Sequence, residues 1–254
     1  MTDPRPTALE EAVRICEAAA SEDITVRLVG GLAIQYLTPE YPPRGGDRQD
    51  LDLATLSSNR RQLTRFLAGR GYVGDKNFNA LYGHKQLYFQ SEETGRSLDV
   101  LVDRLHMCHT VEFKHRLGRM PVTLDLSDLL LTKLQIVELN EKDAQDVLYL
   151  CSAYPVREGD EPGTIGIDRF LPLVGNDWGW WRTITLNLTR IIALASGDGQ
   201  ELVPAGGKHD AVEQLGVLNE AVETAPKSLR WKARAKVGER VRWYEMPEET
   251  PHHS

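Results

Sequence analysis

Two glycines and two carboxylates, placed about twenty residues apart, constrain the fold of this chain more than any other feature. Gly30 and Gly31 end one apolar run, whereas Asp50 and Asp52 stand two residues apart inside another. Alternate residues of a β-strand project from the same face, so we expect the two carboxylates to point together. The chain must therefore form a sheet in which one strand carries paired acids close to a glycine turn.

Hydrophobic periodicity predicts helices and strands in alternation over the first half of the chain. The segment 39–47 is rich in proline and glycine, which indicates a loop. A polar turn separates the last two of the expected strands. We expect helices over 8–20, 32–37 and 59–70, and strands over 24–29, 51–56, 85–90 and 97–102.

The pattern changes after about residue 125. Leucines recur at helical spacing over 129–137, a second helix is expected over 142–149, and the chain from 166 onward is mainly helical in pattern. The sequence contains no internal repeat and no low-complexity run. We therefore expect an α/β (α+β) domain over 1–125, with a sheet flanked by helices, followed by a mainly helical domain over 126–254.

Composition excludes several classes of protein. The 254 residues are 41% hydrophobic and 26% charged, which is ordinary for a globular protein. No apolar run approaches the roughly 18 residues that span a bilayer, and the first residues lack the profile of a secretory signal. The three cysteines include no Cys-x-x-Cys pair, as expected for reduced thiols. We expect a cytoplasmic protein with no membrane contact.

The net charge of −7 argues against a general binder of polyanions, but one segment departs from it. Residues 227–242 contain seven basic residues and one acid, Glu239. A solvated helix face and a local contact with nucleic acid are both compatible with this run. The basic residues are Lys227, Arg230, Lys232, Arg234, Lys236, Arg240 and Arg242.

The paired acids predict a divalent-metal site. Mg²⁺ prefers oxygen ligands and substrate phosphates, and Mn²⁺ is the alternative ion. A two-metal site needs a further carboxylate from a neighbouring strand. Asp99 is the best candidate, because it lies inside the apolar strand 97–102 and a buried carboxylate without a partner is costly. We expect Asp50, Asp52 and Asp99 to be the catalytic metal ligands, against the alternatives of a polar strand edge or a salt bridge.

The glycine pair predicts a different part of the same site. Gly30 and Gly31 lack Cβ atoms, so their backbone can approach a phosphate closely. The helix expected to begin near Leu32 directs its free N–H groups to the same place. Together the two motifs predict a nucleotide site, although a simple turn explains a glycine pair equally well.

These residues resemble the nucleotidyltransferase superfamily that includes DNA polymerase β. Its pattern is an apolar residue and Gly followed by Gly or Ser, then Asp-x-Asp on the next strand and a third acid on a later strand. The resemblance implies a mixed sheet, an NTP substrate, Mg²⁺ as cofactor and transfer of a nucleoside monophosphate to a hydroxyl group. Here Val29-Gly30-Gly31, Asp50-Leu51-Asp52 and Asp99 fit that order.

The likeness continues into the helical half, where it is similar to AbiEii-type toxin nucleotidyltransferases. The segments 128–133 and 142–148 resemble that family's lysine helix and its Lys-Asp-x-x-Asp helix. The resemblance implies that Lys133 binds nucleotide phosphates and that Asp146, and less directly Asp143, supports the site. A polar helix face and ordinary first-turn acids are the alternatives for these residues. The resemblance covers residues 24–150.

The chain departs from the family at several positions. Gly31 replaces a frequent serine, so a hydroxyl contact to phosphate is missing. The family commonly has Arg and Thr before Asp-x-Asp, whereas this chain has Arg48 and Gln49. Glu138 and Lys142 stand in the region where an arginine is expected. These departures leave the acceptor open.

The resemblance to AbiEii-type proteins implies a toxin or abortive-infection role, with a cognate antitoxin as partner. The implied acceptor is RNA, tRNA among them, or a protein hydroxyl. Two alternatives remain: a small-molecule nucleotidyltransferase of the aminoglycoside type, and a catalytically degenerate nucleotide-binding regulatory protein.

Two further motifs have structural alternatives. His106, Cys108 and His109 are types that bind zinc, but no second ligand pair lies at the usual spacing and His115 is only loosely placed. A tryptophan cluster at 178–181 is suited to stacking on bases or to packing the helical half. Cys16 and Cys151 lie on apolar helix faces and are expected in the core.

Overall fold

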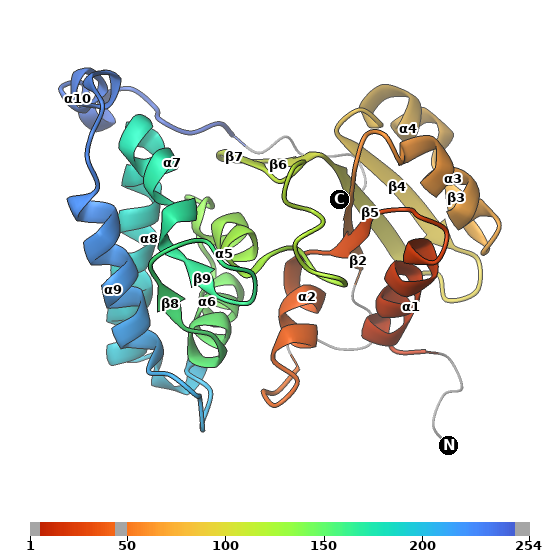
Figure 1. Cartoon of the computed structure of the whole chain (residues 1–254), viewed down its shortest axis with the longest axis horizontal. Coiled ribbons are helices and arrows are strands. Elements are labelled where there is room, and N and C mark those ends of the chain that lie inside the picture. Colours follow the sequence, from red (N-terminus) through yellow and green to blue (C-terminus); the bar gives the residue numbers. More distant parts are fainter. Residues whose placement is uncertain (1–5, 44–49, 247–254) are drawn as a thin grey trace. The chain divides into compact units, whose positions relative to one another are not determined.

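The computed structural model describes residues 6–43 and 50–246, and the chain forms two compact units. Unit 1 comprises 1–105 and 112–125, and unit 2 comprises 106–111 and 126–254. Arg48 and Gln49 lie outside the described residues. Each unit is described by itself below (Figure 1).

Unit 1 is built on a five-stranded mixed sheet with the strand order β1-β2-β5-β4-β3. The pair β2 and β5 is parallel, and the other neighbouring pairs are antiparallel. The strands are β1 (Val26–Leu28), β2 (Leu51–Thr55), β3 (Tyr72–Gly74), β4 (Gln86–Ser91) and β5 (Ser97–Val102).

Four helices of unit 1 pack on this sheet. Helix α1 (Ala8–Ala20) contacts β1 and β2, α2 (Gly30–Leu37) contacts β2, α3 (Arg60–Ala68) contacts β3, and α4 (Lys76–Tyr82) contacts β4. A capping box starts α1, because Thr7 Oγ1 accepts from the Glu10 backbone N–H at 3.2 Å while the Glu10 side chain accepts from the Thr7 backbone N–H at 2.9 Å.

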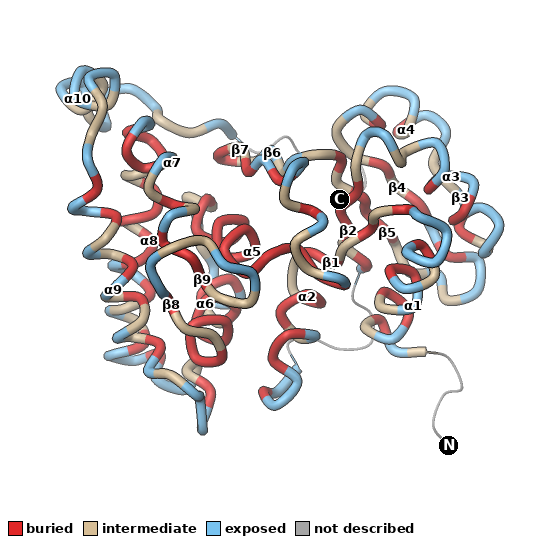
Figure 2. The backbone as a smooth tube through the Cα atoms, viewed as in Figure 1, coloured by how far each residue is buried: buried red, intermediate tan, exposed pale blue. Residues whose placement is uncertain are grey.

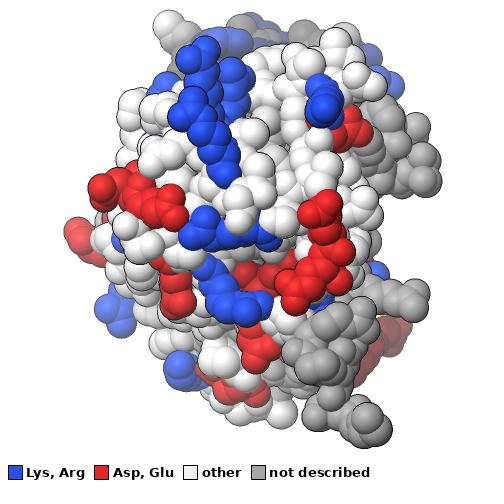
Figure 3. Space-filling view, turned by 90° about the vertical axis from the view of Figure 1, so that its right-hand side faces the viewer, with Lys and Arg blue, Asp and Glu red and all other residues white. Residues whose placement is uncertain are grey.

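The face around α3 and β3 bears patches of both charge signs (Figure 3).

The two faces of the sheet differ in polarity. Leu51, Leu53, Leu98 and Val100 alternate along β2 and β5 and are fully buried (Figure 2). The residues between them, among which are Asp52 and Asp99, project from the opposite face. The central strands therefore supply an apolar core on one side and carboxylates on the other.

Unit 2 is mainly helical. Its longer helices are α5 (Leu126–Leu134), α6 (Glu141–Ala153), α8 (Trp178–Ser196) and α9 (Ala211–Thr224), and α8 packs on α5 and α9. Shorter elements are α7 (Leu171–Asn176), α10 (Leu229–Ala235), the parallel pair β8 (Val156–Arg157) and β9 (Ile165–Gly166), and 3₁₀ turns at Ile167–Arg169, Gln200–Leu202 and Gly238–Arg240. A hairpin of β6 (Arg104–His106) and β7 (Thr110–Glu112) contributes residues to both units.

The predicted fold class, a mixed sheet flanked by helices and followed by a helical half, is confirmed. The predicted helix at 32–37 begins two residues earlier, at Gly30. The segment between 70 and 85, for which no element was expected, contains β3 and α4. Cys16, Cys108 and Cys151 are buried and free. None of the described helices is long and apolar enough to cross a membrane.

Candidate active site

Asp52 and Asp99 are directly opposite each other on neighbouring strands. The parallel register pairs Asp52 of β2 with Asp99 of β5, so both side chains leave the same face of the sheet. Asp99 is 6% exposed and Asp52 is half-buried. The structure therefore brings together two of the three predicted metal ligands.

A neighbouring strand orients one of these carboxylates. The side-chain amide of Gln86, on β4, donates a hydrogen bond to Oδ1 of Asp99. Sequence reasoning missed Gln86, although the alternation of Gln86, Tyr88 and Gln90 in β4 indicates one polar strand face. Gln86 compensates part of the cost of burying the Asp99 carboxylate.

Gly30 lies against the other carboxylate. Its φ angle is +65°, in the left-handed region, and a Cβ atom built on it would lie 2.7 Å from Oδ2 of Asp52. The Val29 backbone N–H donates to the Asp52 carbonyl at 3.0 Å, so the residue that precedes α2 is hydrogen-bonded to β2. Gly30 and Gly31 form the first turn of α2, whose preceding residue, Val29, offers no side-chain cap. The predicted glycine cradle is thus adjacent to Asp52.

Asp50 is placed differently from the other two acids. It is exposed and immediately precedes β2, which begins at Leu51. Within 6–43 and 50–246, no three His, Cys, Asp or Glu side chains gather closely enough to hold a metal ion by themselves. Asp50, Asp52 and Asp99 therefore do not form a metal site made of protein ligands alone.

The donor set still fits magnesium chemistry. Mg²⁺ is usually held by one or two carboxylates, with substrate phosphates and waters completing its octahedral shell. Asp52 and Asp99 provide two hard oxygen donors side by side, and the space beside Gly30 is kept free of a Cβ atom. These residues fit a divalent ion that is bound together with a triphosphate.

Asp103 follows β5 but does not join the pair. Its backbone has a φ of +64°, and its carboxylate accepts from the Ser57 backbone N–H at 2.9 Å and lies 3.6 Å from Lys114 Nζ. Burial alone would raise the pKa of Asp103, but the Ser57 hydrogen bond and the Lys114 charge outweigh it and lower that pKa. Asp103 fixes the end of the strand.

The remaining predicted residues form a second cluster, in unit 2. Nζ of Lys133 on α5 lies 2.8 Å from Asp143 Oδ1 and 2.8 Å from Asp146 Oδ2, both on α6. Burial alone would lower the pKa of Lys133, but the Asp146 and Asp143 carboxylates raise it, so the amine is charged at neutral pH. Asn140 caps α6 by accepting from the Asp143 backbone N–H at 2.9 Å.

The eight predicted site residues thus divide between the units. Gly30, Gly31 and the acids Asp50, Asp52 and Asp99 belong to unit 1, and the cluster of Lys133, Asp143 and Asp146 belongs to unit 2. The nucleotide-binding role of the Lys133 cluster stays a prediction.

Two histidines of the possible zinc motif, His106 and His109, have separate partners. His106 Nε2 lies 2.7 Å from Glu245, whereas His109 Nε2 is 2.8 Å from Thr183 Oγ1 and its ring stacks on Trp180 at 4.7 Å. Burial lowers the pKa of His109 to about 4, so its ring is neutral at pH 7. Cys108 is buried, and His115 is exposed.

No family model matches this chain, and no curated protein sequence matches it. Among solved structures, it is similar to the lincosamide antibiotic adenylyltransferase LnuA bound to lincomycin, with a TM-score of 0.41 and 16% identity over 56% of this chain and 95% of that one. It is also similar to ANT(2")-Ia in complex with adenylyl-2"-tobramycin, with a TM-score of 0.38 and 14% identity over 57% of this chain and 87% of that one.

A third similar structure is an antigenic nucleotidyltransferase-like protein from Paracoccidioides brasiliensis. Its TM-score is 0.41 and its identity 14%, over 87% of this chain and 94% of that one. Because all three TM-scores lie below 0.5, a functional assignment depends on the residues of this chain itself. The AbiEii-type resemblance stays a prediction.

Proposed function

We propose that this protein is a divalent-metal-dependent nucleotidyltransferase. The observation that carries the proposal is the pairing of Asp52 with Asp99 across β2 and β5, with Gly30 held against the Asp52 carboxylate. An apolar sheet core on the other face makes this pair rigid, as a preorganised site requires. Mg²⁺ or Mn²⁺ is the proposed ion and an NTP the proposed substrate.

The proposed reaction forms one phosphorus–oxygen bond and breaks another. A hydroxyl oxygen of the acceptor bonds to the α-phosphorus of the NTP, and the bond from that phosphorus to the β-phosphate oxygen breaks, so pyrophosphate leaves. A divalent ion held by Asp52 and Asp99 would neutralise phosphate charge and lower the pKa of the attacking hydroxyl.

The chain's own residues have distinct parts in this reaction. The backbone N–H groups of Gly30 and Gly31 bind triphosphate oxygens at the first turn of α2. Asp99, oriented by Gln86, takes the proton of the acceptor hydroxyl as general base. Asp50, at the exposed end of the strand, is the proposed third acid.

The proposed acceptor is a hydroxyl group of RNA, tRNA among the candidates, or of a protein, in keeping with a toxin of a toxin–antitoxin or abortive-infection system. A cognate antitoxin is the corresponding proposed partner. The cluster of Lys133, Asp143 and Asp146 keeps its predicted part in nucleotide binding. Cytoplasmic location is part of the same proposal.

The test is to incubate the full chain with each α-³²P-labelled NTP, Mg²⁺ or Mn²⁺, and a cell lysate, then separate RNA, protein and small molecules. Label is expected in the RNA or protein fraction, and D52N or D99N is expected to reduce its transfer at least about 100-fold. D23N is the matched control, because Asp23 is exposed and its φ of +58° is tolerated by asparagine.

Three outcomes would contradict the proposal in different ways. Label found only on a small molecule would contradict the macromolecular acceptor. Full activity in D52N would contradict the assigned site. No label in any fraction, while a known nucleotidyltransferase works in the same assay, would contradict the transferase assignment.

A further inference from the structure

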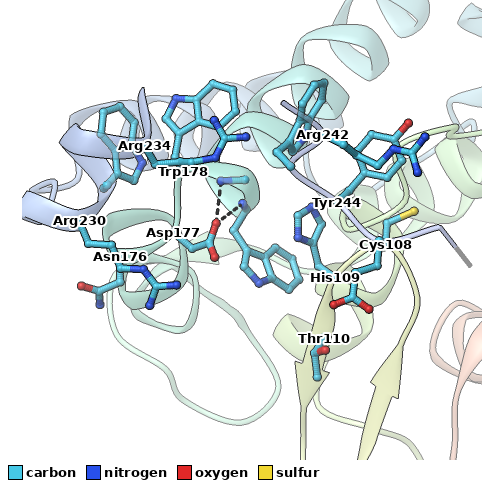
Figure 4. Close-up of a pocket in the computed structure, with 15 residues that line it drawn as sticks. Cys108, His109, Thr110, Asn176, Asp177, Trp178, Arg230, Arg234, Arg242 and Tyr244 are labelled. Carbon is cyan, nitrogen blue, oxygen red and sulfur yellow. Dashed lines mark hydrogen bonds between the residues drawn. The ribbon is translucent and has the colours of Figure 1, made fainter. Parts of the chain in front are cut away.

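Unit 2 contains a cavity of about 510 Å³ that none of the metal-site residues lines. Its walls come from the tip of the β6–β7 hairpin, the start of α8, helix α10 and the chain segment 242–245 (Figure 4). The Glu245 backbone N–H donates to the Cys108 carbonyl at 3.0 Å, which fixes segment 242–245 along the hairpin. The cavity is therefore a feature of the folded unit.

Aromatic rings make up much of the wall. Trp178 and Trp180 are buried, whereas Trp231, Trp243 and Tyr244 line the cavity and are half-exposed. Trp178 and Trp243 meet edge to face at 5.9 Å. The indole N–H of Trp231 is buried and donates no hydrogen bond to any described residue.

Three arginines line the same cavity, and none of them pairs with a carboxylate among the described residues. Arg234 donates to the carbonyls of Gly238 and Val241, both at 2.7 Å, and lies over the Trp178 ring at 4.8 Å. Arg230 and Arg242 are exposed. Their guanidinium groups are thus available to an anion.

The two acids of the cavity are already engaged. Asp177 caps α8 by accepting from the Gly179 and Trp180 backbone N–H groups at 2.6 and 3.2 Å. Glu245 pairs with His106 at 2.7 Å. The lining therefore carries three arginines against two acids, a small formal excess of positive charge in a protein whose net charge is −7.

A second cavity of about 430 Å³ adjoins the first. The two share Arg242, Trp243 and Tyr244, and the second adds Arg182 and Arg190. Arg182 pairs with Glu239 at 2.6 Å, whereas among the described residues Arg190 donates to the Val137 carbonyl, at 3.2 Å, and pairs with no carboxylate. Two basic, aromatic cavities that share the residues of one segment fit consecutive units of a polymer better than one small molecule.

We propose that these two cavities bind successive nucleotides of a single-stranded nucleic acid. Bases stack on the half-exposed rings of Trp231, Trp243 and Tyr244, as in other single-strand sites. Arg230 and Arg242 bind backbone phosphates. An acidic peptide would satisfy the arginines but would offer no planar group to the rings.

The role of this surface as the site of the acceptor depends on the proposed nucleotidyl transfer. Its binding of nucleic acid does not depend on that reaction and can be measured without it. The test therefore measures binding in EDTA. All five tryptophans lie between 178 and 243, and four of them line the cavities, so quenching of intrinsic fluorescence reports binding directly. The probes are a ten-nucleotide single-stranded RNA, the same sequence as DNA, the RNA duplex and decaglutamate.

Single-stranded RNA or DNA is expected to quench the fluorescence and to bind more tightly than the duplex. A comparison of the RNA with the DNA shows which of the two nucleic acids the cavities bind more tightly. The double variant R230A/R242A is expected to weaken binding at least about tenfold and to reduce the salt slope by about 1.4, since each single-strand phosphate contact contributes about 0.7. W231L is expected to weaken binding at least about fivefold. K236A/R240A removes the same charge from exposed positions outside both cavities and is the matched control.

Equal losses in R230A/R242A and K236A/R240A would overturn the proposal, because they would indicate general electrostatic attraction. Tighter binding of decaglutamate than of either single strand would overturn it in favour of a protein partner. Unaltered binding by D52N, together with no nucleotidyl transfer by the wild type, would contradict the proposed function alone. Transfer activity without binding of either single strand would contradict this inference alone.

Discussion

At the scale of single residues, Gly30 is the most constrained position of the candidate active site. Its left-handed backbone and its contact with Asp52 are two separate requirements: the first disfavours a side chain, and the second leaves no room for a Cβ atom. Gly95 shares the first requirement without the second, since its φ is +72° and nothing lies within 4 Å of its missing Cβ. The two glycines therefore separate backbone strain from disturbance of the carboxylate.

We predict that G30A and G95A each lose about 1 kcal/mol of stability from the strained backbone. Only G30A is expected to lose transfer activity as well, by about 100-fold, because the new methyl group must displace the Asp52 carboxylate. Urea unfolding and the labelled-NTP assay measure the two effects. Equal activity in the two variants would show that the contact between Gly30 and Asp52 has no part in the reaction.

The sequence singled out Gly30, Asp52 and Asp99 through the order, spacing and strand context of their motifs. The structure brings these three residues together, and their role in catalysis stays a prediction. The sequence did not identify Gln86, because a glutamine in a short polar-apolar strand has many ordinary uses. The hydrogen bond to Asp99 depends on which strands are neighbours. Strand neighbours follow from tertiary packing, which periodicity does not encode.

At the scale of elements, a buried charge cluster joins α1 to the sheet of unit 1. Glu11 of α1 is 5% exposed and accepts hydrogen bonds from the Tyr72 hydroxyl, Arg96 and the Thr94 hydroxyl. Burial and the neighbouring Glu11 carboxylate raise the pKa of Tyr72, so its hydroxyl stays protonated and donates. Removing one partner leaves a buried charge incompletely paired.

We predict that R96M lowers the free energy of unfolding by about 3–5 kcal/mol, since it leaves Glu11 buried without its cation. R104M breaks an ion pair whose side chains are 52% and 54% exposed, and its expected cost is about 0–1 kcal/mol. Circular dichroism follows the unfolding, because unit 1 contains no tryptophan. Similar losses in the two variants would contradict the structural role given to Glu11.

Element types were predictable where the hydrophobic pattern is clear, as in α1, β2, β5 and α6. Strand β3 and helix α4 were missed, because three and seven residues are too few for a period to be recognised. The ion pairs of Lys133 with Asp143 and Asp146 were also missed, since they depend on how α5 packs against α6. Local sequence predicts an element, but it does not predict what that element contacts.

At the scale of the whole molecule, the acidic and the basic candidate sites belong to different units. The paired carboxylates lie in unit 1, whereas the basic, aromatic cavities lie in unit 2. The basic segment 227–242 was predicted to be either a solvated face or a contact for nucleic acid. Arg230, Arg234 and Arg242 of that segment line cavities, and Lys236 and Arg240 are exposed outside them. The solvated face describes Lys236 and Arg240, whereas contact with nucleic acid stays a proposal for the residues that line the cavities.

The most direct test of the central claim is a count of the Mn²⁺ ions that the full chain binds in the presence of a non-hydrolysable NTP. In the proposed site Asp52 and Asp99 supply two carboxylates and the triphosphate supplies the other oxygen ligands, so tight binding is expected to need all three together. Electron paramagnetic resonance of free Mn²⁺ gives the count. We predict NTP-dependent binding of one or two ions per chain by the wild type and by D23N, and its loss in D52N and D99N. Undiminished NTP-dependent binding in D52N and D99N would contradict the claim.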